Sequence, residues 1–306
     1  MSMKQPPSSN GVTLSLEELI FFKQHTVHWL PPAKSLWSQL HGQHHSSRLG
    51  RGMDFAEVRQ YQPGDDIRSI DWRVTARTGK THTKVFCEEK EKPVILYLDF
   101  SSSMQFGSTL MLKSVLMAHM ASLISWISVA QKDRIGAVID DGQTLVEVKP
   151  TSRSKGPLQI IQKMIDGHQS SLARLGNTTS QTSMSDGLKT LTRLCPKGSE
   201  IVLLSDFTRL DESNTTFINQ LNRHNRIKVI QIIDPLERGK TTYRGVELVS
   251  NRIKNQWIDF SSKKTRQQIE HAFTDHQQSL KSLCHSQAIH YSSLSSDSPL
   301  LQQLSG

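Results

Sequence analysis

The chain has 306 residues, of which 36% are hydrophobic and 21% charged, so it can bury a substantial core in one or two domains. Its net charge of +9 is evenly spread, because residues 1–92, 93–210 and 211–306 each carry an excess of three positive charges. Without a basic block or interleaved aromatic residues, this charge does not indicate a nucleic-acid groove. Three widely separated cysteines exclude a disulfide framework and a cysteine-based zinc site.

The N-terminal stretch "MSMKQPPSSNG" lacks the apolar core of a signal peptide. Ser114–Gln131 contains no Asp, Glu, Lys or Arg, but it only just reaches the length of a spanning helix, and His119 and several serines interrupt it. We therefore expect a buried helix there and no membrane span. Together with the cysteine usage, this predicts a cytoplasmic protein.

The first part of the chain, residues 1–92, is predicted to form an arm or a small β-rich subdomain. Within it, "PGDD" at Pro63–Asp66 is a turn signature, since Pro presets φ and Gly permits positive φ. The sequence places four arginines near three aspartates, and we expect ion pairs that hold a hairpin-like arm against the sheet. These residues are Arg59, Arg68, Arg73 and Arg77, with Asp65, Asp66 and Asp71.

Residues 93–306 are predicted to form an α/β domain, which begins with a strand at Val94–Leu98. This apolar run follows Pro93 and is rich in β-formers, which is typical of a strand buried on both faces. It runs into the polar segment Asp99–Ser103, and the apolar Thr109–Ala130 predicts a long helix. A strand-to-helix turn of this kind lies where open α/β sheets bind ligands. The alternative interpretation is that these oxygens only cap a helix.

Further strands and helices alternate along the chain. Arg134–Asp140 and Thr144–Pro150 are predicted to form a hairpin through Asp141-Gly142. The remaining predicted elements are a helix in "GPLQIIQKMI", a helix from about Ser183, strands at Glu200–Phe207 and Ile227–Asp234 around a helix at Glu212–His224, strands at Val246–Val249 and Gln256–Phe260, a helix at Lys263–Leu283 and a strand in "AIHYSSL". This order predicts right-handed crossovers and a mostly parallel, doubly wound sheet with helices on both faces.

Oxygen-bearing side chains follow three of these segments at one edge of the predicted sheet. They are Asp99, Ser101, Ser103, Thr182 and Asp206. Carboxylates and hydroxyls, without sulfur or imidazole, are the ligands of a hard cation, and Mg²⁺ (or Mn²⁺ in its place) fits this set. We expect one coordination position to remain with water, which an Asp or Glu of a partner could displace.

The set resembles the metal-ion-dependent adhesion site (MIDAS) of von Willebrand factor A domains, whose motif is Asp-x-Ser-x-Ser, then a Thr, then an Asp. "DFSSS" matches the first part, "TSMSDGL" contains Thr182, and "LLSDF" contains Asp206. The family often has Thr-Asp-Gly at the last place, where Ser205-Asp206-Phe207 stands here. This sequence keeps the carboxylate but does not specify the shape of the loop. Thr178 and Thr179 are competing candidates for the threonine.

The segment from Gly50 to Met104 is similar to the bacterial domain-of-unknown-function family fifty-eight, a von Willebrand factor A-like group. The resemblance rests on Gly50, Gly52, Phe55, Arg59, Tyr61, "PGDD", Arg68, "IDW" at Ile70–Trp72 and "TAR" at Thr75–Arg77, and a looser match extends through Asp234-Pro235. Members are often encoded beside MoxR-type AAA+ ATPases. The resemblance therefore implies an assembly or chaperone-like role, without an established enzymatic activity.

Two functions follow from this sequence. The first is a non-enzymatic, Mg²⁺-dependent protein-interaction module that works with a MoxR-type AAA+ ATPase on a client protein supplying an acidic ligand. The alternative is a metal-dependent, phosphatase-like hydrolase that uses Asp99 as nucleophile or metal ligand, although Ser101 stands where such phosphatases place an acid/base Asp. Two weaker signals concern other ligands. "TGKT" at Thr78–Thr81 ends like a phosphate-binding loop but lacks its earlier glycine. A cluster of histidines could bind a transition metal but lacks a helical pairing; it consists of His25, His28, His41, His44 and His45.

Overall fold

The structure is a computed structural model that describes residues 5–28, 49–87, 91–175, 181–239, 244–250 and 255–305. By its contacts the chain divides into two compact units. The larger unit comprises Met1–Leu36 and Lys92–Gly306, and the smaller comprises Trp37–Glu91. Each unit has secondary structure of its own.

The larger unit is built on a six-stranded sheet with the order β10-β7-β6-β3-β4-β5. Its strands are β3 (Pro93–Asp99), β4 (Arg134–Asp140), β5 (Leu145–Thr151), β6 (Glu200–Ser205), β7 (Arg226–Ile233) and β10 (His290–Ser295). All neighbouring pairs are parallel except β4 and β5, which form the antiparallel hairpin predicted at Asp141-Gly142. The predicted mixed α/β fold with a mostly parallel sheet is confirmed.

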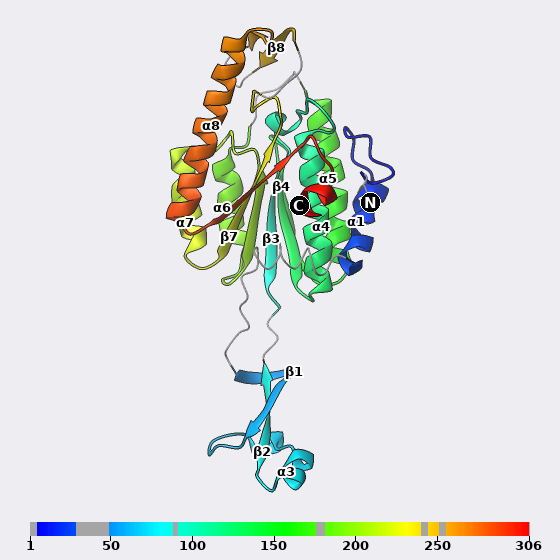
Figure 1. Cartoon of the computed structure of the whole chain (residues 1–306), viewed down its shortest axis with the longest axis vertical. Helices are drawn as coiled ribbons and strands as arrows, with labels where there is room; N and C mark the ends of the chain where they lie inside the picture. The colour runs from blue at the N-terminus through cyan, green and yellow to red at the C-terminus, as the bar shows by residue number, and fades with distance from the viewer. Residues whose placement is uncertain are drawn as a thin grey trace. The chain divides into compact units, whose positions relative to one another are not determined.

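Helices cover both faces of this sheet (Figure 1). On one side lie α1 (Leu16–His28), α4 (Lys113–Ala130) and α5 (Lys155–Ala173), with the short α9 (Leu300–Ser305) against α4. On the other lie α6 (Met184–Leu194), α7 (Glu212–Asn222) and α8 (Lys263–Ser286). The strands in the middle of the sheet are therefore buried on both faces, which is why they appear in the sequence as continuous apolar runs.

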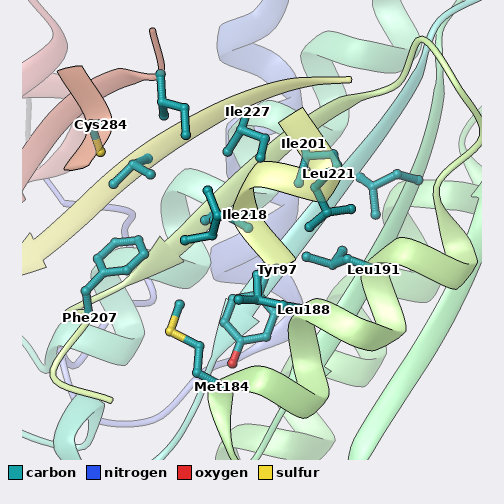
Figure 2. Close-up of a cluster of buried hydrophobic side chains, with 14 of the residues drawn as sticks. Tyr97, Met184, Leu188, Leu191, Ile201, Phe207, Ile218, Leu221, Ile227 and Cys284 are labelled. Carbon is teal, nitrogen blue, oxygen red and sulfur yellow. The ribbon is translucent and has the colours of Figure 1, made fainter. Parts of the chain in front are cut away.

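The core under α6 and α7 sets the position of the central strand β3. Tyr97 of β3 lies against Leu188 of α6, next to Ile201 of β6 and Ile218 of α7 (Figure 2). Helix α6 can approach this closely because Gly187 faces the Tyr97 ring, where a Cβ would come within 2.4 Å of a ring carbon. The same contact leaves the Tyr97 hydroxyl at the carboxyl end of the sheet.

Helix α4 is the apolar segment that the sequence predicts as a buried helix. By length and composition it is the one helix among the described residues that could cross a membrane, and 83% of it is buried within the unit. Buried serine hydroxyls of α4 find acceptors within the helix: Ser125 and Ser128 donate to backbone carbonyls one turn back, at 2.7 and 2.9 Å. The burial agrees with a core helix.

The N-terminal helix α1 belongs to the larger unit, whereas the predicted division into domains 1–92 and 93–306 places it in the arm. Leu19 and Phe22 are fully buried against the larger unit, and the carboxylate of Glu18 lies 2.7 Å from His119 Nε2 of α4 with both side chains inaccessible. The sequence interpretation missed this association because α1 is short and its partner lies far along the chain. The arm predicted over residues 1–92 therefore does not include α1.

The smaller unit contains β1 (Leu49–Gln60) paired antiparallel with β2 (His82–Cys87), and the helices η1 (Ile67–Ser69) and α3 (Trp72–Thr78) between them. The predicted pairing of Arg59 with Asp65 is present, with two hydrogen bonds of 2.9 and 2.7 Å. Asp66 and Asp71 instead cap the N-termini of η1 and α3. "TGKT" starts at Thr78, the last residue of α3, so a phosphate at this end of the helix would meet carbonyls rather than N–H groups.

The C-terminal part contains the three strands predicted there. Strands β8 (Val246–Ser250) and β9 (Asn255–Asp259) form a separate two-stranded sheet. Strand β10 covers most of the predicted strand in "AIHYSSL" and ends at Ser295. Serines suit this position because β10 is an edge strand whose side chains are partly exposed.

Replacing Gly187 by Ala should lower the free energy of unfolding by about 1–3 kcal/mol, because the new methyl group would push α6 away from Tyr97. Gly167→Ala in α5 is the matched control, since its Cβ would meet only a methyl group of Ile139, at 3.3 Å. Alanine raises helix propensity at both sites by a similar amount. Urea denaturation measures the difference, and equal stabilities of the two variants would contradict the packing described.

Candidate functional site

The carboxyl ends of β3, β4 and β6 bring three acidic residues to one edge of the sheet. Asp99 ends β3 and lies in register with Asp140, the last residue of β4. Asp206 directly follows β6, which pairs with the other side of β3. All three carboxylates are buried, with 0–2% of their surface exposed. Because carboxylates this close together repel one another, the fold must supply positive charge or hydrogen-bond donors nearby.

Asp99 is surrounded by donors. Its Oδ1 accepts a hydrogen bond from the Ser101 backbone N–H at 2.9 Å and another from Arg209 Nη2 at 2.6 Å. Its Oδ2 accepts the Ser205 hydroxyl at 2.6 Å. The first of these contacts is the turn-capping role that the sequence left open as the alternative for Asp99. The second is an ion pair that the sequence did not reveal.

Arg209 connects two strand ends. The same Nη2 that contacts Asp99 lies 2.7 Å from Asp140 Oδ2, which also accepts the Tyr97 hydroxyl at 2.8 Å. Arg209 is only 6% exposed, and the neighbouring carboxylates raise its pKa even though burial alone would lower it. It stays charged, and one guanidinium neutralises parts of two carboxylates at once.

The backbone conformation after Asp206 places the Arg209 side chain next to Asp99 and Asp140. Phe207 has φ of 61°, in the left-handed region that favours glycine. This is the position where the adhesion-site family often has Gly, so the loop takes a glycine-like conformation without one. The strain is offset by the full burial of the Phe207 side chain and by the hydrogen bond from its N–H to Ser205 Oγ at 2.9 Å.

Asp206 has its own cation, Lys113, from the first turn of α4. The two groups are 2.9 Å apart, and Lys113 is 1% exposed. Lys113 also pairs with Glu237, while Asp206 Oδ1 accepts the N–H and the hydroxyl of Thr208 at 3.0 and 2.9 Å. Although burial would raise the pKa of Asp206, the ammonium of Lys113 lowers it to about 2.

The pKa of Asp99 is shifted upward, opposite to that of Asp206. Burial raises its pKa, the nearby carboxylates of Asp140 and Asp206 add to that effect, and Arg209 offsets only part of it. The pKa values of the two predicted metal-binding carboxylates are therefore driven apart by their surroundings. This difference matches their partners, since Arg209 is shared between two carboxylates whereas Lys113 lies directly on Asp206.

The predicted hydroxyl ligands are in the same region, and one of them, Ser103, contacts Asp206. Ser101 Oγ and Ser103 Oγ are 3.3 Å apart, and Ser103 Oγ lies 3.2 Å from the oxygen of the Thr208 hydroxyl, whose proton is donated to Asp206. Thr182 donates to Asp140 Oδ1 at 2.7 Å. The alternatives Thr178 and Thr179 lie outside the described residues, as do the side chains of the predicted histidine cluster.

This arrangement does not fit a Mg²⁺ ion. Each of the carboxylates Asp99 and Asp206 accepts three hydrogen bonds, one of them from a buried cation. A metal ion would have to displace Lys113 or Arg209, which are held by two carboxylates each.

The decisive residues that sequence reasoning missed are Lys113, Arg209 and Asp140. Lys113 had a usable signal, because it is the one Lys, Arg, Asp or Glu in α4 and stands at the N-terminus, where the helix dipole disfavours a cation. A lone lysine in that place indicates a carboxylate partner. Arg209 follows Asp206 by three residues, but its direction depends on the conformation of Phe207, which the sequence does not specify.

Replacing Lys113 by Met should cost about 3–5 kcal/mol of unfolding free energy at pH 7, because it leaves Asp206 buried without its cation. The pKa of Asp206 falls from its ordinary 3.8 to about 2 on folding, so the ion pair contributes fully above pH 4 and is lost as pH falls toward 2. The gap between wild type and variant should narrow over that range. Urea denaturation at several pH values measures it, and a constant gap would contradict this role of Asp206.

Relatives of known sequence match only parts of this chain. A 109-residue stretch is 37% identical to uncharacterized proteins of Mycobacterium tuberculosis and Mycobacterium bovis, and it covers 36% of this chain and 34% of theirs. A 64-residue stretch is 41% identical to the uncharacterized protein YeaD of Bacillus subtilis, covering 21% of this chain and 15% of that protein. The chain thus matches about a third or less of the length of these relatives.

Three solved structures are similar at low identity. The conserved hypothetical protein BatB of Bacteroides thetaiotaomicron is 13% identical, with a TM-score of 0.35 over 64% of this chain and 98% of that one. A von Willebrand factor type A protein of Catenulispora acidiphila is 13% identical, with a TM-score of 0.31 over 61% and 43%. An aerotolerance-related membrane protein of Bacteroides fragilis is 11% identical, with a TM-score of 0.32 over 60% and 88%.

The expected cytoplasmic location is contradicted by these comparisons, because a similar structure is described as a membrane protein. The expectation relied on the cysteines and on the N-terminal segment, neither of which reports where a folded domain is held. One of these similar structures is itself a von Willebrand factor type A protein. The family model described as "Protein of unknown function DUF58" matches residues 57–279, well over half of the chain, and this protein belongs to that family.

Proposed function

We propose that this protein is a non-enzymatic protein-interaction module that works with a MoxR-type AAA+ ATPase in the assembly or maturation of other proteins. The observation that carries the proposal is the state of the edge carboxylates: Asp99 and Asp206 are buried and each is paired with a cation. A group in this state is a poor nucleophile and a poor base. The ATPase partner comes from the family resemblance alone.

Other reactive groups in the described residues support the same conclusion. Burial raises the pKa of the Cys195 thiol to about 12 and that of Cys284 to about 11, so both remain protonated at neutral pH. His168 is buried, which lowers its pKa, and its Nε2 contacts the backbone carbonyl of Val12 at 2.8 Å. None of these three side chains combines exposure with an activating partner, as a catalytic group requires.

The exposed side chains at this edge are suited to contact rather than catalysis. Ser102, Ser183 and Thr208 are exposed and neutral, and they lie in the turns that follow β3 and β6 or precede α6. Within the smaller unit, Trp72 is 68% exposed and Ile67 66%. Exposed Trp side chains are frequent anchors of protein interfaces. Both units therefore offer surfaces that a protein partner could use.

The first test distinguishes this proposal from the phosphatase-like alternative. Wild-type protein, assayed on generic phosphomonoesters with Mg²⁺ or Mn²⁺, should show no turnover above that of Asp99→Asn. The physical reason is that Asp99 has no exposed surface and accepts hydrogen bonds on both oxygens. Metal-dependent turnover that disappears in Asp99→Asn would establish the hydrolase instead.

The second test asks whether the sheet edge binds the ATPase. Thr208→Arg places a bulky charge on the exposed side of the edge and should weaken binding of the MoxR-type ATPase by about tenfold or more, since central interface changes commonly cost over 1 kcal/mol. Thr274→Arg, at an exposed position of α8, is the matched control. Surface plasmon resonance with both purified proteins measures the affinities. Equal binding by the two variants would exclude this edge as the contact.

A further inference from the structure

The buried cations at the sheet edge carry the charge that a divalent metal would bring. Lys113 contributes one positive charge beside Asp206, and Arg209 contributes one beside Asp99. Together they supply the two charges of a Mg²⁺ ion. The cations enter from different elements, since Lys113 belongs to α4 and Arg209 to the loop after β6, so the replacement is built into the packing of the domain.

The hydrogen-bonding capacity of the predicted ligands is also used within the protein. Asp99 and Asp206 each accept three donors, and Thr182 donates to Asp140. A hydrated metal ion would gain the oxygens of Asp99 only by breaking buried hydrogen bonds of 2.6–2.9 Å. The competing cations are covalently part of the chain, so they face these carboxylates at a high effective concentration.

We infer that Lys113 and Arg209 replace the divalent cation at this sheet edge, and that this edge recognises a partner through neutral hydrogen-bonding groups instead of a metal-bound carboxylate. The exposed hydroxyls of Ser102 and Thr208 are the groups that such a partner would meet. A partner carboxylate has no accessible cation here, because Lys113 is 1% and Arg209 6% exposed. The inference rests on the proposed function for its partner but not for its metal chemistry.

The metal chemistry is tested without a partner, by titrating Mn²⁺ into the full-length protein and following free Mn²⁺ by electron paramagnetic resonance. We expect no site tighter than about 1 mM, the weak end for protein sites with oxygen ligands, and the same melting temperature with Mg²⁺ or with EDTA. Tighter binding that Ser103→Ala and Asp206→Asn both abolish would overturn the inference. Tighter binding that neither variant changes would support it, because the ion would then be bound outside this edge.

A gain-of-binding variant provides an independent arm. Lys113→Met removes the cation on Asp206, and we expect it to bind Mn²⁺ at least about tenfold more tightly than wild type, since metal affinity rises with uncompensated ligand charge. Lys113→Arg, which keeps the charge, is the control and should behave as wild type. Circular dichroism verifies that each variant folds. If Lys113→Met does not fold, the wild-type titration still decides the question.

The partner arm measures binding of the nucleotide-free ATPase with Mg²⁺ and with EDTA. Equal affinity in both conditions supports the inference, and loss of binding in EDTA, reversed by Mg²⁺, overturns it. If no ATPase binds in either condition, the proposed partner is wrong, while the Mn²⁺ titration still decides whether the edge holds a metal. The two conclusions can therefore fail separately.

Discussion

A buried guanidinium joins the two strands on which the sheet edge depends. Arg209 lies within 2.7 Å of Asp99 at the end of β3 and of Asp140 at the end of β4. Without it, two carboxylates in register on neighbouring strands would face each other in a region that excludes water. Their repulsion would be strong there, because the effective dielectric constant is lower than in bulk solvent. The position of Arg209 in turn depends on the turn at Phe207.

The second ion pair connects the edge to the helices. Lys113 lies at the start of α4 and contacts Asp206 after β6 and Glu237 after β7. Burying such charges is costly, and their mutual attraction often does little more than offset the loss of hydration. Their value here is geometric, since Lys113 contacts both Asp206 and Glu237 only while α4 and the loops after β6 and β7 keep their positions. The edge is therefore organised by charge pairing on a hydrophobic base formed by Tyr97 and the residues around it.

Residues of the adhesion-site motif can have two uses, which are to shape the turns of the backbone and to bind a metal ion, and only the first of them is seen here. The motif residues shape the turns: Asp99 accepts the Ser101 N–H, and Asp206 accepts the Thr208 N–H. Side chains of this type are suited to such local bonds, and the bonds need no metal. A sequence can thus keep the oxygens of the motif for their effect on the backbone while cations from elsewhere in the fold take the charge. The pattern by itself cannot distinguish these two uses.

The sequence by itself determined the strands of the main sheet and most of the helices that cover it, although not α1, because the periodicity of apolar residues is a local property. The strand at Val94–Leu98, the hairpin at Asp141-Gly142 and a buried helix within Thr109–Ala130 follow from it, as does the gathering of Asp99 and Asp206 at one edge. Tertiary structure decided what those carboxylates meet. Lysine and arginine have long, flexible side chains whose partners depend on how α4 and the Phe207 turn pack, and contacts such as Glu18 with His119 join residues too distant in the chain for any spacing to reveal.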